Sequence, residues 1–109
     1  AQLASNRVRE GISAAERRDW LDARNALREA VAIDPFNSDA RTRYNKAQSE
    51  CQKIALQLYQ AAKAYITNTN NNDAQKSCMQ ALKYADRPSD PYNGKCMELL
   101  NRIKRFETE

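Results

Sequence analysis

The sequence contains no histidine, and this absence narrows the chemistry that the protein can perform. Histidine is the commonest general base in enzymes and the commonest metal ligand, and it titrates near neutral pH. Without it, no nucleophile, base and orienting group can be assembled from the residues that remain. The sequence therefore predicts a protein that is not an enzyme and that holds no metal ion and no cofactor.

Glycine and proline are also scarce, with two and three residues respectively among 109. A many-stranded sandwich or barrel needs turn-forming residues about every 8–12 positions. Apolar residues never form an uninterrupted run near the ~18 residues that a membrane-spanning helix needs. These shortages predict an all-α chain, of a length typical of one domain, with no membrane span.

The net charge of +4 comes from 18 basic and 14 acidic residues that are mixed along the chain. Acidic residues alternate at helical spacings with the arginines near the amino terminus, which favours a solvated surface. Aromatic residues that could stack on bases are not interleaved with these arginines, so nucleic acid is a disfavoured partner. The arginines in question are Arg7, Arg9, Arg17, Arg18, Arg24 and Arg28.

Five helices are predicted from apolar residues at three- and four-residue steps and from the residues that interrupt them. Asp19 and Ser38 are the expected N-caps of the second and third helices, and Pro35 ends the second. Ser89 or Asp90 is expected to cap the fifth. The predicted ranges are 3–17, 19–33, 38–67, 73–85, and from about 91 to near the end of the chain.

The predicted helix 38–67 contains no glycine or proline and carries a seam of apolar residues, alternately four and three apart. One uninterrupted helix about 45 Å long fits this pattern, with its two halves packed on different partners. If part of the seam is exposed, it can pair with a second copy of the chain, so a homodimer stays open. The seam consists of Ala40, Tyr44, Ala47, Cys51, Ile54, Leu58, Ala61 and Tyr65.

The sequence also repeats itself. The positions of Ala23, Leu27 and Ala30 recur 51 residues later as Ala74, Cys78 and Ala81. The segment Asp34-Pro35-Phe36-Asn37 recurs 56 residues later as Asp90-Pro91-Tyr92-Asn93. We interpret residues 1–109 as a single domain, expected to be a fragment of a larger protein, of two helical hairpins, about 3–50 and 51–107, each followed by a covering helix. The difference between the two shifts predicts an insertion around Arg87-Pro88.

The first hairpin resembles the tetratricopeptide (TPR) repeat in Gly11 and in residues 19–35, DWLDARNALREAVAIDP. The second hairpin matches more weakly, with asparagine where the pattern has an aromatic residue after the turn. The resemblance implies a five-helix TPR-like fold, and the long third helix that serves both hairpins departs from the family, whose tandem repeats would turn near its middle. The positions that it assigns to helix packing are Gly11, Trp20, Ala23, Leu27, Ala30, Pro35, Ala62, Ala74, Cys78, Ala81 and Pro91.

The resemblance also implies a non-catalytic protein–protein interaction or scaffold domain that binds a peptide or a partner helix. Val8, Ile12 and Tyr59 are the candidate partner-binding residues. Some TPR domains hold a carboxylate with Lys, Arg and Asn, but Val8 and Ile12 are apolar, so that activity is not expected. One alternative function is a structural spacer or self-association module, and a less favoured one is a nucleic-acid-binding helical repeat.

Cys51, Cys78 and Cys96 form no CxxC pair, so a zinc site is not expected, and all three are interpreted as small buried apolar residues. The repeat places Cys78 and Cys96 on facing helices, which leaves a disulfide between them as an alternative. That bond would imply a periplasmic or other oxidising compartment, whereas free thiols favour the cytoplasm.

Overall fold

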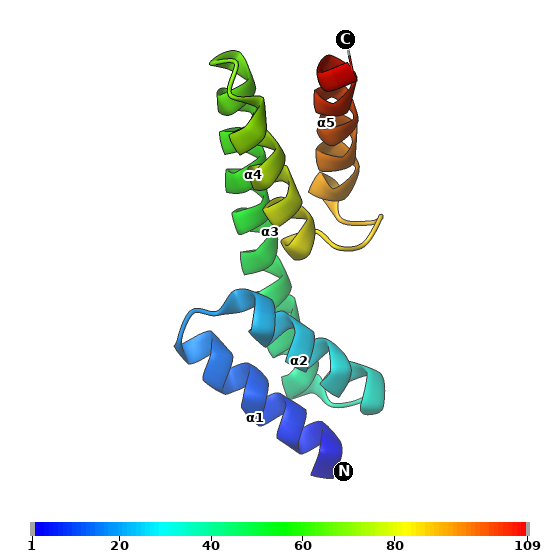
Figure 1. Ribbon diagram of the computed structural model, residues 1–109. Helices are drawn as coiled ribbons and strands as arrows, with labels where there is room; N and C mark the ends of the chain where they lie inside the picture. Colours follow the sequence, from blue (N-terminus) through cyan, green and yellow to red (C-terminus); the bar gives the residue numbers. More distant parts are fainter. Residues whose placement is uncertain (1, 109) are drawn as a thin grey trace. The chain divides into compact units, whose positions relative to one another are not determined.

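The computed structural model describes residues 2–108, and these form five α-helices and no strand (Figure 1). The predicted all-α fold is therefore confirmed. The third helix is one uninterrupted element of 30 residues, with the predicted ends. The helices are α1 (Gln2–Glu16), α2 (Trp20–Ile33), α3 (Ser38–Thr67), α4 (Asn71–Tyr84) and α5 (Pro91–Thr108).

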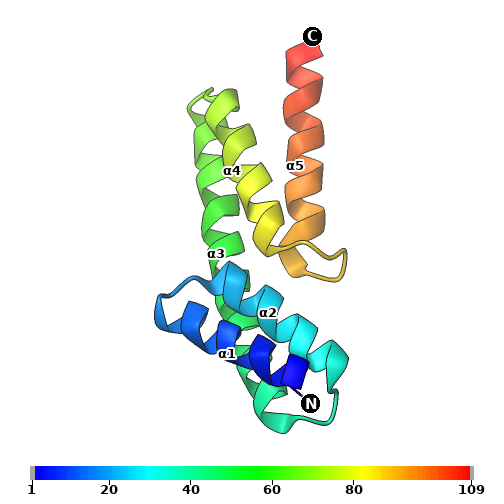
Figure 2. The ribbon, with the colours of Figure 1, turned by 60° about the horizontal axis from the view of Figure 1, so that its bottom comes forward.

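The chain divides into two units, Ala1–Cys51 (unit 1) and Gln52–Glu109 (unit 2), and α3 contributes residues to both. In unit 1, α1 and α2 lie side by side in opposite directions (Figures 1 and 2), and Leu27 is the largest residue of their core. In unit 2, the later part of α3 forms a hairpin with α4, and α5 adds Leu99 to that core. Each unit thus buries its own apolar cluster.

The two hairpins have the same backbone at a shift of 51 residues. Helix α2 spans Trp20–Ile33 and α4 spans Asn71–Tyr84, which is the same range displaced by that shift. Each hairpin turns through a non-glycine residue in the left-handed region, Arg18 and Thr69, both with φ of 59°. Because both the helix ends and the positive φ recur, the turn between α1 and α2 recurs between α3 and α4.

The N-caps of the second helices repeat as well. The Asp19 side chain accepts a hydrogen bond from the N–H of Asp22 at 3.4 Å, and the Asn70 side chain accepts one from the N–H of Asp73 at 3.3 Å. The short polar side chains Asp and Asn are the residue types that satisfy free N–H groups at helix starts. Since Asn70 takes this role, α4 begins two residues before its predicted start.

The N-cap of α3 is Asn37, whereas the sequence predicts Ser38. The Asn37 side-chain oxygen accepts a hydrogen bond from the N–H of Ala40 at 3.1 Å, and its carbonyl accepts one from the N–H of Arg41 at 3.1 Å. The turn that begins at Asp34 brings the asparagine, rather than the serine, to the capping position.

Residues 34–37 and 90–93 share one backbone hydrogen bond, from the N–H of Asn37 or Asn93 to the carbonyl of Asp34 or Asp90 at 3.2 Å, but the following helices begin at different positions. Phe36 lies in the loop before α3 and is 93% exposed, whereas Tyr92 is the second residue of α5 and is half-buried. Proline fits the first position of a helix because its missing N–H would have no helical partner there, so Pro91 starts α5. The side chain of Asp90 is buried and accepts a hydrogen bond from the N–H of Arg87 at 3.0 Å.

Gly11 makes the close approach of α1 and α2 possible. A Cβ placed on Gly11 would lie 2.5 Å from Cγ and 2.8 Å from Cδ2 of Leu27, which is 1% exposed. At the equivalent positions of unit 2, the first residue has a Cβ and the second is smaller: Ala62 and Cys78, both fully buried. At the same helix crossing, unit 1 therefore pairs a glycine with a large side chain, and unit 2 pairs two small side chains.

Candidate functional site

Unit 1 contains an open groove between α1 and the first part of α3, with a volume of about 370 Å³. We call it groove 1. Its floor and one wall are apolar, because Ile12 and Ala15 of α1 and Trp20 of α2 present half-buried side chains to it. Its lining residues are Gly11, Ile12, Ala15, Trp20, Leu27, Asp39, Thr42, Arg43 and Lys46.

The other wall of groove 1 is charged and comes from α3. Arg43 is paired with Asp39, at 3.1 Å between Nε and Oδ2, and Lys46 is paired with Glu50 at 3.0 Å. The Lys46 ammonium also lies 6.0 Å from the centroid of the Trp20 ring. Groove 1 thus combines an apolar floor with a rim of exposed ion pairs, which is the usual anatomy of a protein-binding surface.

The equivalent groove of unit 2 (groove 2) is much smaller, at about 190 Å³, and is lined by Lys63, Ile66, Thr67, Leu99 and Arg102. Shifts of 51 and 56 residues relate Ile12 to Lys63 and Arg43 to Leu99. Leu99 is 4% exposed and packs on Ala62 and Cys78, so it fills space that is open in unit 1. The repeat therefore yields one larger groove and one of about half its volume.

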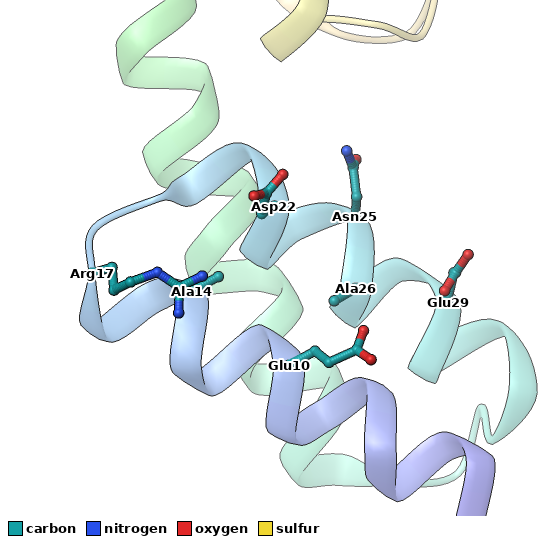
Figure 3. Close-up of a pocket in the computed structure, with 7 residues that line it drawn as sticks. All are labelled: Glu10, Ala14, Arg17, Asp22, Asn25, Ala26 and Glu29. Atoms are coloured by element: carbon teal, nitrogen blue, oxygen red, sulfur yellow. The ribbon is translucent and has the colours of Figure 1, made fainter.

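A second depression of unit 1 lies on another side of the α1–α2 hairpin and is polar (Figure 3). Glu10 projects from α1, while Asp22 and Glu29 project from α2. Arg7 binds Glu10 at 2.8 Å and Glu29 at 2.7 Å, and the nearby Glu10, then Glu29, raises the pKa of the Arg7 guanidinium. We interpret these charges as links between the two helices.

Asp22 has a raised pKa in this depression, caused first by its hydrogen bond with Asp19 and then by the charge of that carboxylate. Both carboxylates lie at the exposed start of α2, where Asp19 acts as N-cap. In unit 2, alanine and glutamine replace Glu10 and Glu29, as Ala61 and Gln80. Glu10 and Glu29 are thus particular to unit 1, whereas Asp22 has an acidic counterpart in Asp73.

The structure distributes the predicted partner-binding residues over two places. Ile12 lines groove 1, and Val8 is half-buried one turn before it on α1. Tyr59 lies in unit 2, where its ring stacks at a tilt on Tyr92, with 6.1 Å between ring centroids. The alanines assigned to helix packing, Ala23, Ala30, Ala62, Ala74 and Ala81, are all completely buried, as Leu27 nearly is.

The first half of the apolar seam of α3 is largely buried, whereas in the second half Ile54, Leu58 and Ala61 are half-buried and Tyr65 is 38% exposed. Ala40, Ala47 and Cys51 are at most 1% exposed, and the Cys51 thiol donates a hydrogen bond to the carbonyl of Trp20 at 3.2 Å. The first half of the seam is thus used for packing within unit 1. It is not available for a coiled coil with a second copy.

The candidate disulfide between Cys78 and Cys96 is not formed, and Cys51, Cys78 and Cys96 are all buried free thiols. Burial raises the pKa of Cys78 to about 11, with a further contribution from Cys96, and burial also raises the pKa of Cys96. Because disulfide exchange proceeds through the thiolate, such burial opposes the predicted bond.

These thiols should make stability depend on pH in the alkaline range. Their raised pKa values mean that the folded chain keeps protons that the unfolded chain loses. The stability that the protonated thiols contribute is therefore fully present below pH 9 and is lost as the pH rises to about 11. We expect Cys78 to account for about 1–2 kcal/mol of this loss. Urea unfolding across this range should show a shallower fall for Cys78→Ala than for wild type, and parallel curves would contradict the assignment.

The burial of Arg24 and the charged rim of groove 1 do not follow from the sequence pattern. Arg24 was grouped with the solvated arginines, but it is 1% exposed, and its guanidinium donates to the Asn25 side-chain oxygen at 3.0 Å. Its long apolar stem can be buried beside Ala23 while its polar end is hydrogen-bonded. The rim residues Arg43 and Lys46 were also missed, and the 56-residue shift was the signal that could have identified them.

Comparisons with protein-family models, with curated proteins and with solved structures found no match to this chain. None of the helices in the described part of the chain is both long and apolar enough to cross a membrane. Within the same residues, no three metal-ligating side chains lie close enough together to hold a metal ion.

Proposed function

We propose that this chain is a TPR-like, non-catalytic interaction domain, and that groove 1 binds a peptide or a helix of a partner protein. The observation that carries the proposal is the contrast between the repeats: groove 1 is large and has an apolar floor, whereas Leu99 partly fills its smaller counterpart. The resemblance to TPR repeats is supported by hairpins that repeat turn for turn and by Gly11 at a close helix crossing.

The physical basis is the burial of apolar surface. Ile12 and Trp20 are only half-buried in the free chain, and a side chain placed between them would bury both further. Burying one aliphatic side chain contributes about 1.5–3 kcal/mol, which is sufficient for a specific anchor. The ion pairs of α3 at the rim would orient the bound segment and contribute less to its affinity.

A peptide library displayed on phage and selected against the wild-type chain tests this function. Selected peptides should bind Ile12→Glu at least about tenfold more weakly, because a carboxylate would interrupt the apolar floor. The matched control is Ile33→Glu, since Ile33 is also in unit 1, is 44% exposed and does not line groove 1. Equal binding to both variants, or no selection above background, would reject the proposal.

A further inference from the structure

Unit 2 carries a second surface, which differs from groove 1 in chemistry. It is formed by Tyr59 and Lys63 of α3 and by Tyr92, Lys95 and Arg102 of α5, and we call it the Lys–Tyr surface. Lys63 and Arg102 also line groove 2. All three basic side chains are exposed, and both tyrosines are half-buried.

The tyrosines and lysines of this surface hold one another in place. The rings of Tyr59 and Tyr92 lie 6.1 Å apart. The Lys63 ammonium lies 5.1 Å from the Tyr59 ring centroid, and the Lys95 ammonium lies 5.4 Å from that of Tyr92. Cation–π contacts of this kind restrict a lysine without neutralising its charge. Two positive charges are thus fixed around one aromatic pair.

The ion pairs found in the described part of the chain do not include these positive charges. None of the described carboxylates forms an ion pair with Lys63, Lys95 or Arg102, although Glu98 lies only four residues before Arg102 on α5. On groove 1, by contrast, Arg43 and Lys46 each have a carboxylate partner within their own helix. The 56-residue shift relates Asp39 and Lys46, which form ion pairs in unit 1, to Lys95 and Arg102.

From this arrangement we propose that the Lys–Tyr surface binds an acidic segment of a partner protein, independently of groove 1. Aspartate and glutamate side chains would pair with the three cations, and the apolar parts of the segment would lie against the tyrosine rings. Nucleic acid fits less well. Each ring has an ammonium group over it and the two rings contact each other, so bases have little free ring surface on which to stack.

The test uses the full chain labelled with ¹⁵N and a short synthetic peptide rich in glutamate, compared with a peptide that has glutamine at each glutamate. The glutamate peptide should shift the amide signals of residues near 59, 63, 92, 95 and 102, and its affinity should fall as salt is added. The glutamine peptide should produce no such shifts. The absence of localised shifts at low salt, or equal shifts with both peptides, would overturn the proposal.

Charge reversal separates this surface from the net charge of the chain. Arg102→Glu and Lys104→Glu change the same helix by the same charge, but only Arg102 lines groove 2, and both side chains are exposed. We expect about tenfold weaker binding of the glutamate peptide to Arg102→Glu and little change with Lys104→Glu. Equal weakening would mean a non-specific charge effect and would overturn the proposal, as would tighter binding of single-stranded oligouridylate at the same residues. Binding of groove 1 peptides should be unaffected by Arg102→Glu, so this inference and the proposed function fail separately.

Discussion

Gly11→Ala is expected to lower the free energy of unfolding by about 1–2 kcal/mol, although alanine is the better helix former. The added Cβ would lie 2.5 Å from Cγ of the buried Leu27 side chain, so that side chain would have to shift out of its packed position at the helix crossing. The matched control is Gly94→Ala in α5, where a Cβ would meet no atom within 4 Å. That variant should gain up to about 1 kcal/mol, and urea unfolding measures both.

The second hairpin suggests how this loss can be repaired. Its equivalent pair is Ala62 and Cys78, so the double variant Gly11→Ala/Leu27→Cys transfers that solution into unit 1. Leu27→Cys alone should cost about 2–3 kcal/mol through the cavity that it leaves. The double variant should be more stable than the sum of the single effects by about 1 kcal/mol or more. Additive effects would show that the two crossings are not equivalent.

Ser49→Pro is expected to lower the free energy of unfolding by about 3 kcal/mol or more. Ser49 is exposed in the middle of α3, and proline there removes the hydrogen bond to the carbonyl of Asn45 and places its ring against that carbonyl. Circular dichroism and urea unfolding should show lost helix and lost stability. A fully stable variant would contradict an uninterrupted α3.

The same change at the start of the helix provides the control. Ser38 is the first residue of α3 and is exposed, so Ser38→Pro should be within about 0.5 kcal/mol of wild type. Helix α5 already begins with Pro91, which shows that this chain accepts proline at that position. A large loss of stability in Ser38→Pro would mean that the effect of proline on α3 does not depend on its position in the helix.

Local sequence signals were sufficient for the helices and for the 51-residue repeat. The ends of α3 and the N-cap Asp19 follow from apolar spacing, from Pro35 and from the preference of short polar side chains for helix starts. Gly11 and Ala62 could be aligned because both lie at helix crossings, where a small residue is required. These features depend on neighbours within a few residues or on a simple shift.

Features that depend on contacts between distant residues could not be obtained in this way. Whether a groove is open depends on the side chain opposite it, such as Arg43 in unit 1 or Leu99 in unit 2. The arginine pattern indicated solvent for Arg24, whose burial depends on how α2 is packed. The pairing of Tyr59 with Tyr92 likewise joins residues 33 positions apart, in helices whose packing determines the distance between them.

Groove 1 is proposed to be a binding site because it lacks the leucine that partly fills groove 2. Arg43→Leu introduces that leucine, and Arg41→Leu makes the same change at an exposed residue of α3 that does not line the groove. The decisive measurement is the affinity of peptides selected on the wild-type chain for these two variants. We predict at least about tenfold weaker binding to Arg43→Leu and unchanged binding to Arg41→Leu. Wild-type affinity in Arg43→Leu, or an equal loss in Arg41→Leu, would contradict the claim.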